Sequence, residues 1–283
     1  MLRLMAIFAH PDDESMGVGG TLARYAAEGV EVSLVTATRG ERGWFGPGKH
    51  PGFDILGHRR EVELHQAART LGINRVDFLN YLDGDLDQAP PRQITAKLVA
   101  HLRRVRPHVV VTFGHDGAYG HPDHIAISQF TTAAVMRAAD PCYGPRSGCG
   151  SNSHAVSKLY YFVSSEEQAG AYERAFGELS MTIDGVHRAI RGWRDWEITT
   201  TIDAGEHWRT GWNAVACHRS QLPGYQALLE QPEPEHRLLW GTQNFVRAFS
   251  LVNGGRARET DLFAGLDEAE TLMTQHAAIT LAA

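Results

Sequence analysis

The stretch "LRLMAIFAHPDDE", residues 2–14, joins an apolar run to a histidine and three acids. A continuous apolar run of this length predicts a strand that is buried on both faces. Unpaired carboxylates are costly to bury, so a charged cluster behind such a strand is normally paired, solvated or bound to a cation. The stretch therefore predicts a core strand that ends in a polar site.

Four apolar runs alternate with helical patterns along the first half of the chain. The strands are expected at 2–9, 30–38, 75–82 and 107–113, and the helices at 19–29, 57–73, 91–106 and 122–139. Gly29 and Gly72 stand where the first two helices should end. Strands that alternate with helices form right-handed βαβ units, so the sequence predicts an α/β fold with a mostly parallel sheet.

The second half of the chain is less regular. It begins with a glycine-rich loop at 141–154. Further strands are expected near 158–163, 196–203 and 244–252, with a helix around 206–218 and a peripheral helix from about Asp267. We expect one domain over residues 1–283, in which residues 155–283 complete the sheet and the pocket of a core formed by residues 1–140.

The composition is that of an ordinary globular protein, with 43% hydrophobic and 21% charged residues. A formal charge of −6 argues against general binding of nucleic acid or anionic membranes, which usually needs a basic face. No run approaches the roughly 18 apolar residues of a membrane span. The three cysteines, Cys142, Cys149 and Cys217, do not suggest a disulfide framework. These features predict a cytoplasmic protein and leave open whether it forms a homo-oligomer.

Two short motifs share one pattern: "HPDD" at His10–Asp13 and "HPDH" at His121–His124. Each follows a predicted strand, and open parallel sheets bind ligands at the carboxyl ends of their strands. Proline favours a tight turn or the first turn of a helix, which brings residues i and i+3 to one side. One such motif alone could be a solvated turn or a helix cap. Two of them at one sheet edge predict a three-residue zinc site with an open position for water.

The sequence also resembles a known family. "AHPDDE", followed later by "RPHVVVTF" and "GAYGHPDH", is similar to the LmbE/PIG-L family of zinc-dependent N-deacetylases. The similarity extends to "TRGERG", "RREVELHQAARTLG", "DGDL" and "CHRSQ", and so covers most of the chain. It implies a Rossmann-like three-layer fold and a hydrolase that removes the acetyl group from an N-acetylglucosamine-containing small molecule.

The resemblance assigns roles at the metal site. His10, Asp13 and His124 would bind Zn²⁺. Asp12 would be the general base, because successive side chains diverge and Asp12 can reach the water on the metal. Zinc lowers the pKa of bound water towards about 7 and polarises the acetyl carbonyl.

The resemblance also assigns three residues that act on the reacting amide. His121 would stabilise the oxyanion or protonate the leaving amine, with Asp123 as the partner that orients it. Tyr119 would help to polarise the carbonyl.

Arg60 and Asp83 match family positions that hold sugar hydroxyls. Arg59 is the alternative to Arg60, because the register around "GHRR" is uncertain by one residue. The other explanation of Arg60 is an ion pair with Glu61 or Glu63 on an exposed helix.

Three alternatives to the deacetylase stay open. Two histidines and one carboxylate also form the iron site of non-haem oxygenases, and a metal-stabilised sugar-binding module would need the ligands but not Asp12. Within the family, a mycothiol S-conjugate amidase would share the same core. Residues 44–54 and 141–154 are expected to line the outer pocket, whereas the family motif at His218 and the segment Gln243–Phe245 have no assigned role.

Overall fold

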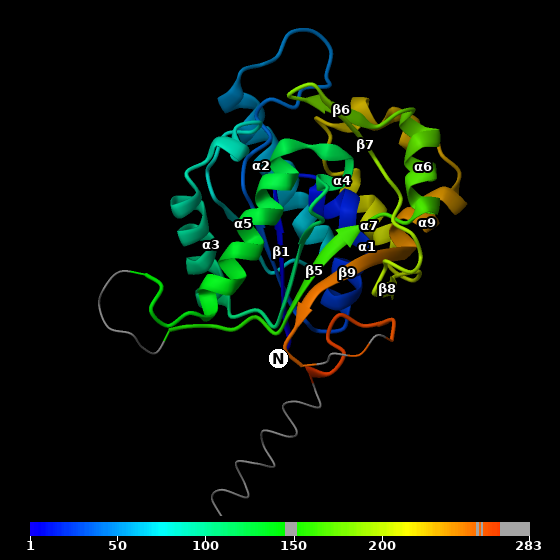
Figure 1. The fold of residues 1–283 in the computed structure, drawn as a ribbon. Helices are drawn as coiled ribbons and strands as arrows, with labels where there is room; N and C mark the ends of the chain where they lie inside the picture. Colours follow the sequence, from blue (N-terminus) through cyan, green and yellow to red (C-terminus); the bar gives the residue numbers. More distant parts are fainter. Residues whose placement is uncertain (145–151, 253–254, 256, 267–283) are drawn as a thin grey trace, which may run out of the picture.

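The computed structural model describes residues 1–144, 152–252, 255 and 257–266 (Figure 1). A seven-stranded sheet in the order β3-β2-β1-β4-β5-β9-β8 forms its centre. The strands are β1 (Arg3–Phe8), β2 (Glu31–Thr36), β3 (Arg75–Phe78), β4 (Val109–Phe113), β5 (Lys158–Val163), β8 (Thr200–Asp203) and β9 (Thr242–Ser250). Neighbours among β1 to β5 pair in parallel, whereas β9 runs antiparallel to both β5 and β8. The predicted α/β fold with a mostly parallel sheet is confirmed.

Helices cover both faces of the sheet (Figure 1). One layer contains α1 (Asp13–Ala27), α2 (Phe53–Leu71) and α7 (Trp208–Val215), and the other contains α3 (Pro91–Val105) and α5 (Pro122–Ala139). Residues 4–8 of β1 and all of β4 are buried, as their continuous apolar sequences predict. Gly72 ends α2 with a φ of 74°, in the left-handed conformation that glycine adopts readily.

The two His-Pro motifs lie where the strand order reverses. β1 and β4 are neighbours, but the chain continues from β1 to β2 on one side of this pair and from β4 to β5 on the other. The helices that follow, α1 and α5, therefore cover opposite faces and leave a crevice between the carboxyl ends of β1 and β4. Residues 10–13 follow closely on β1, whereas residues 121–124 follow β4 after the intervening residues 114–120. The two segments meet in the crevice.

The sequence analysis missed several elements of the second half. The helix α6 (Glu166–Phe176) follows β5, and the strands β6 (Ser180–Ile183) and β7 (Val186–Ala189) form a separate hairpin. Short helical segments are α4 (Gly117–Gly120), α8 (Gln226–Leu229), α9 (Glu233–Gly241), η1 (Leu86–Gln88) and η2 (Leu222–Tyr225). A capping box between Ser165 and Gln168 begins α6, and this pattern is visible in the sequence.

Helix α1 is interrupted at Val18, where φ is −133°. The side-chain amide of Gln243, on β9, fills the break. Its oxygen accepts from Thr21 N at 2.5 Å and its nitrogen donates to Gly17 O at 2.8 Å. In a regular helix these two backbone groups would bond to each other. Gln243 thus supports the helix that begins at Asp13.

Two expectations about the 141–154 region are wrong for its described part, residues 141–144 and 152–154, whereas residues 145–151 lie outside the described residues. Cys142 is disulfide-bonded, while Cys217 is free. The described parts of the loop lie at the far end of α5, where His154 N donates to Ala138 O. Because α5 runs away from the carboxyl ends of the strands, these parts lie at the opposite edge of the sheet and do not line the pocket.

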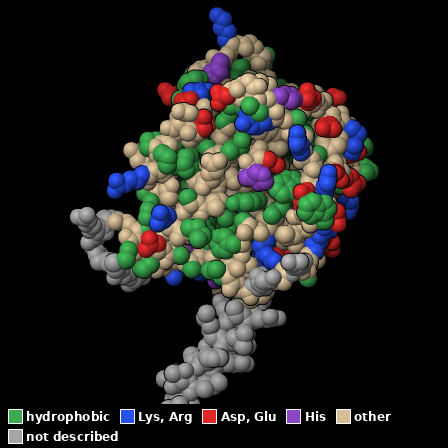
Figure 2. Space-filling view, in the orientation of Figure 1, with side chains coloured by type: hydrophobic (Ala, Val, Ile, Leu, Met, Phe, Trp, Pro, Cys, Tyr) green, Lys and Arg blue, Asp and Glu red, His purple; other side chains and the backbone are tan. Residues whose placement is uncertain are grey.

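Charged side chains of both signs lie on the surface. On the face shown in Figure 2, positive and negative side chains are interspersed, and no broad basic patch is visible. Among the described residues, no helix has the length and apolar character needed to cross a membrane. The peripheral helix expected from Asp267 lies outside the described residues.

Candidate metal and catalytic site

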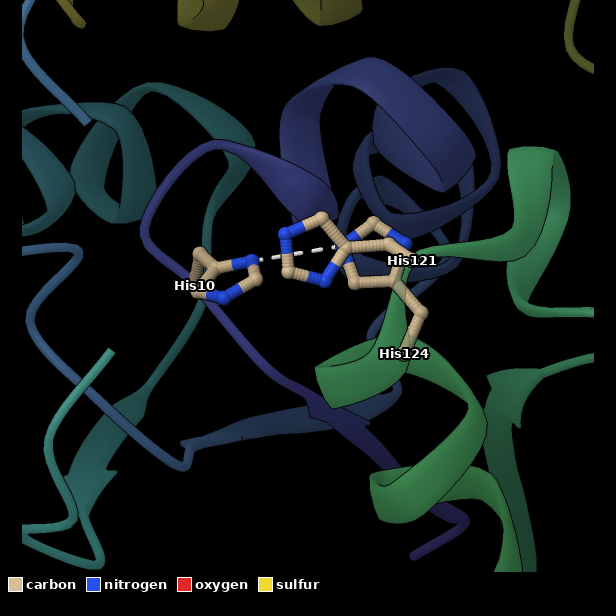
Figure 3. Close-up of side chains that lie close together, drawn as sticks. All are labelled: His10, His121 and His124. Carbon is tan, nitrogen blue, oxygen red and sulfur yellow. Dashed lines mark hydrogen bonds between the residues drawn. The ribbon is translucent and has the colours of Figure 1, made fainter. Parts of the chain in front are cut away.

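The turns after β1 and β4 bring the three predicted metal ligands together. Figure 3 shows two of them, His10 and His124, beside His121. His10 Nδ1 lies 3.2 Å from His124 Nε2. Asp13 reaches both rings, with Oδ2 3.7 Å from His10 Nδ1 and Oδ1 3.4 Å from His124 Nε2. All three side chains are buried. The donor atoms therefore converge on one point, as the ligands of a single ion must.

In both histidines, the ring nitrogen on the outer side of the cluster faces hydrogen-bond acceptors. His10 Nε2 lies 3.1 Å from an oxygen of Asp123 and 3.1 Å from an oxygen of Asp83. His124 Nδ1 lies 3.3 Å from Gly117 O. When these outer nitrogens carry the protons, the inner nitrogens turn lone pairs towards each other. Such an arrangement is repulsive without a cation between them, so the donor set fits a metal ion such as zinc.

The charges of the cluster also favour a cation. Burial by itself lowers the pKa of His10, but hydrogen bonds to two neighbouring carboxylates and the charge of Asp13 raise it well above its ordinary value. Burial by itself raises the pKa of Asp13, whereas His124 and His10 hold it below its usual range. The carboxylates thus attract positive charge to the point where the donor atoms meet.

Two other groupings of donor atoms share His10. His10, His121 and His124 form one group and His10, Asp83 and Asp123 another, each with donor atoms within 4.8 Å of one another. The rings of His121 and His124 stack with their centroids 4.6 Å apart. His121 is therefore a rival to Asp13 for the third ligand position.

Asp12 has an unusual backbone conformation. Its φ of 114° lies outside the regions that side chains other than glycine usually adopt. Asp12 Oδ2 accepts from the Tyr225 hydroxyl at 2.5 Å and from Arg60 Nη2 at 3.0 Å. Burial raises the pKa of Asp12, and the charge of Arg60 counters this only in part. A buried carboxylate with a raised pKa beside the donor cluster fits the predicted general base.

Arg60 is buried, with 3% of its surface exposed. Besides binding Asp12, Nη2 donates to Pro11 O at 2.5 Å and Nη1 to Gly40 O at 2.9 Å. Glu63 instead accepts from Ser220. The explanation of Arg60 as one half of an exposed ion pair on α2 is therefore wrong.

Arg59 and Asp83 are placed very differently. Arg59 is exposed, with its guanidinium 5.6 Å from the centre of the Trp44 ring. Asp83 is buried beside the cavity, where one oxygen faces His10 Nε2 and the other accepts from Arg42 N at 3.0 Å. Arg60 and Asp83 both line the cavity, and their contacts with a substrate stay predictions.

His121 and Asp123 do not form the predicted pair of side chains. The Asp123 carboxylate accepts from two backbone N–H groups of the 84–86 loop and contacts His10. Its backbone N–H, however, donates to His121 Nδ1 at 3.2 Å. This bond leaves the proton of a neutral imidazole on Nε2. Burial next to His124 and His10 lowers the pKa of His121 to about 3, so His121 fits a neutral hydrogen-bond donor better than an acid.

Tyr119 lies in the 117–120 turn, in which three of the four residues have a positive φ. Its ring centroid is 5.5 Å from that of His124, and the side chain lines the cavity. Burial raises the pKa of Tyr119, and the charges of Asp13 and Asp12 raise it further. The hydroxyl therefore stays protonated and can donate a hydrogen bond.

A buried network that the sequence analysis did not assign lies behind Asp12. His218 Nε2 lies 2.9 Å from Glu14 Oε1, and the Ser15 hydroxyl donates to the same oxygen at 2.5 Å. The other oxygen of Glu14 accepts from Asp12 N at 3.0 Å. Glu14 and His218 are fully buried, so this network fixes the backbone of the first turn. His218 belongs to the "CHRSQ" motif, whereas nothing in the sequence pointed to Tyr225 as a partner of Asp12.

Comparison with known proteins identifies the family to which this chain belongs. The model of the PIG-L family, described as GlcNAc-PI de-N-acetylase, matches residues 5–135. A 1D-myo-inositol 2-acetamido-2-deoxy-alpha-D-glucopyranoside deacetylase of Streptomyces griseus is 35% identical over 94% of this chain and 90% of the relative. The chain belongs to the PIG-L family. The resemblance carried by the two His-Pro motifs is thereby confirmed, and so is the prediction of an amide-hydrolysing enzyme.

Solved structures share this PIG-L fold. A conserved protein of Thermus thermophilus matches with a TM-score of 0.63 and 27% identity, over 90% of this chain and 98% of that chain. An N,N'-diacetylchitobiose deacetylase of Pyrococcus horikoshii also has a TM-score of 0.63, at 21% identity over 87% of this chain and 83% of that chain. At that identity the second match shows the fold alone. Membership of the PIG-L family favours the deacetylase over the iron oxygenase and the sugar-binding module.

Proposed function

We propose that this PIG-L family member removes the acetyl group from an N-acetylglucosamine-containing small molecule by metal-assisted hydrolysis. The supporting observation is the convergence of donor atoms from His10, Asp13 and His124 next to the carboxylate of Asp12. The donor cluster alone would account for metal binding. A buried carboxylate beside it supplies the base that hydrolysis requires.

Zinc is the proposed ion, with His10, Asp13 and His124 as its ligands. A bound zinc ion would lower the pKa of water and polarise the amide carbonyl. Asp123 is proposed as a positioning residue, because its carboxylate holds the outer nitrogen of His10. His121 is then left to act on the substrate.

The surrounding residues handle the proton and the developing charge. Asp12 takes a proton from the attacking water, and its hydrogen bonds from Arg60 and Tyr225 keep the carboxylate in place. The Nε2–H of His121 and the hydroxyl of Tyr119 donate to the carbonyl oxygen as it becomes negative. Donors fixed in place before the reaction stabilise such charge without reorganisation.

Arg60 and Asp83 are the proposed contacts with sugar hydroxyls, since both line the cavity next to the cluster. Losing such a contact typically costs about 1–3 kcal/mol. Arg60→Ala would also release Asp12 from its ion pair. We therefore expect this variant to lower kcat as well as kcat/KM, with its zinc content unchanged.

The decisive experiment measures acetate and free amine released from a panel of N-acetylglucosaminides. Zinc-loaded enzyme should release both in equal amounts, and chelator-treated enzyme should regain activity when zinc is returned. A mycothiol S-conjugate in the same panel tests the amidase alternative, which predicts faster cleavage of that compound. Zinc-loaded enzyme that releases no acetate from any N-acetylated sugar would contradict the proposal.

We also propose that residues 1–283 form one domain, with residues 155–283 completing the sheet and the pocket. β5, β8 and β9 belong to the same sheet as β1, and α6 contributes side chains to the cavity, which supports this division. A cytoplasmic location stays a prediction.

A further inference from the structure

The cavity above the metal cluster has two walls of different chemistry. Its volume of about 370 Å³ lies within the range of about 300–1,000 Å³ that is typical of sites for small molecules. Asp83, Arg60 and Gln221 present polar groups on the side of β2 and β3. Such groups suit the hydroxyls of a sugar, and we call these three residues the polar wall.

The other side is an apolar wall. Its six apolar side chains are those of Met16 of α1, Phe162 of β5, Tyr172 and Phe176 of α6, and Leu179 and Ile190, which flank the β6–β7 hairpin. Ser164, directly after β5, adds a polar residue on this side. The sheet order places β2 and β3 on one side of the β1–β4 pair and β5 on the other. The metal cluster follows β1 and β4, so it lies between the polar wall and the apolar wall.

The apolar wall is a formed surface with an open side. The Tyr172 hydroxyl donates to Met16 O at 3.2 Å, so this hydroxyl is used within the protein. Behind the wall, Tyr172 and Ile190 belong to a packed cluster with Trp208 and Trp240. Met16, Phe162, Phe176 and Leu179 are only partly buried although they line the cavity. Apolar surface left open inside a cavity is typical of a ligand site.

Neither the inositol nor the acetyl group named in the substrate of the Streptomyces relative suits the apolar wall. Most hydroxyls of a polyol pressed against the six apolar side chains would lose water without gaining hydrogen-bond partners, because Ser164 can bond to few of them. The methyl of an acetyl group is too small to cover six side chains. A larger hydrocarbon or aryl group would cover the wall and gain free energy from burial.

We propose that the apolar wall binds a hydrocarbon or aryl group of the substrate. The enzyme then prefers N-acylated amino sugars that carry such a group over the inositol conjugate named for its Streptomyces relative. This inference rests on the proposed function. The apolar group can be attached in two ways: as a longer acyl chain on the amide nitrogen, or as the aglycone of the sugar.

Two substrate series separate these attachments. The first lengthens the acyl group of methyl N-acylglucosaminide from acetyl through propanoyl and butanoyl to hexanoyl. The second keeps the acetyl group and changes the glycoside from methyl through butyl to hexyl and phenyl. Burial of one methylene is worth a factor of up to about four in kcat/KM, so we expect a stepwise rise along one series. A rise in the first assigns the wall to the acyl chain, and a rise in the second assigns it to the aglycone.

The same assay separates failure of this inference from failure of the proposed function. If the methyl glycoside of N-acetylglucosamine is hydrolysed but neither series rises, the inference is wrong and the proposed function stands. A higher kcat/KM for the inositol conjugate than for every apolar compound also overturns the inference. If no compound is hydrolysed, the proposed function fails and the inference fails with it.

A matched pair of variants locates the effect. Leu179→Asn places an amide in the apolar wall and should bring the ratio of kcat/KM between the longest and shortest substrates close to one. Leu251→Asn is the control, because Leu251 is 65% exposed at the far end of β9, next to the amino end of β5. The control should keep the wild-type ratio. An unchanged ratio in Leu179→Asn would show that the wall does not bind the apolar group.

Discussion

The two His-Pro-Asp turns, residues 10–13 and 121–124, have almost the same sequence but different proposed roles. The first supplies two of the proposed metal ligands, His10 and Asp13, whereas the second supplies only His124. The third residue differs most. Asp12 faces Arg60 and Tyr225 in the cavity wall, while the carboxylate of Asp123 turns to the 84–86 loop. The same residue type is thus a proposed base in one turn and a positioning residue in the other.

Backbone conformation explains this difference. Asp12 precedes α1 with a φ of 114° and is held there by the carboxylate of Glu14. Asp123 is already inside the first turn of α5, after Pro122, and its N–H is capped by His121. A proline at the first helical position favours this regular start. The matching aspartates of the two motifs therefore point in different directions, because α1 begins at the fourth residue of its motif and α5 at the second.

The largest effect is expected from removing a metal ligand, and it shows how many ligands each turn supplies. His124→Ala should lose both the metal and all measurable activity, because it removes one of three ligands. His121→Ala should keep about one zinc per chain and lower kcat by about 10²–10³, the usual cost of one donor to an oxyanion. Metal analysis after dialysis and steady-state kinetics measure the two effects. Metal that is lost in His121→Ala but kept in Asp13→Ala would establish the three-histidine set instead.

The next effect compares the third residues of the turns. Asp12→Asn should keep the zinc and lower kcat by about 10²–10⁴, which is what general-base catalysis contributes. The substitution preserves size and the acceptor for Tyr225 while removing basicity. The measurement is kcat at saturating substrate and zinc, with metal content checked in the same sample. A kcat close to that of the wild type would exclude Asp12 as the base.

The same substitution in the second turn should act on the metal. Asp123→Asn weakens the bond to His10 Nε2, and loss of such an orienting partner costs about 10–100-fold in metal affinity or activity. We expect weaker zinc binding in a competition with a chelating dye, and a kcat that largely recovers at saturating zinc. If kcat at saturating zinc falls as far as in Asp12→Asn, the two acids have equivalent roles and the contrast between the turns is lost.

The smallest effect concerns the support of the first turn. His218→Asn removes the bond to Glu14 and should lower the free energy of unfolding by about 1–3 kcal/mol, the usual cost of an unpaired buried group. Because Glu14 holds Asp12 N, we also expect a several-fold lower kcat in the folded enzyme. His236→Asn is the control, since His236 is also a buried histidine with one bond, to Leu228 O. Equal loss of stability with equal kcat in both variants would reduce His218 to a purely structural residue.

Local sequence patterns were enough to predict the core and the place of the site. Apolar runs predicted β1, β2 and β4, because a strand that is buried on both faces has a continuous apolar sequence. Gly72 predicted the end of α2, because a left-handed cap favours glycine. The rule that parallel strands end at one edge then placed residues 10–13 beside residues 121–124. The choice of His10, Asp13 and His124 among these residues came from the resemblance to the PIG-L family, and it stays a prediction.

The contacts of individual polar groups were decided only by the tertiary structure. Arg60 is separated from Asp12 by 48 positions and Tyr225 by 213, and no periodicity or cap indicates that these three meet. The hairpin and α6, which build the apolar wall, approach the cavity through packing against α9 and the 117–120 turn. The hydrophobic periodicity of the sequence predicts whether a residue is buried. It does not predict which residue pairs with a buried charge, because that depends on how distant segments pack together.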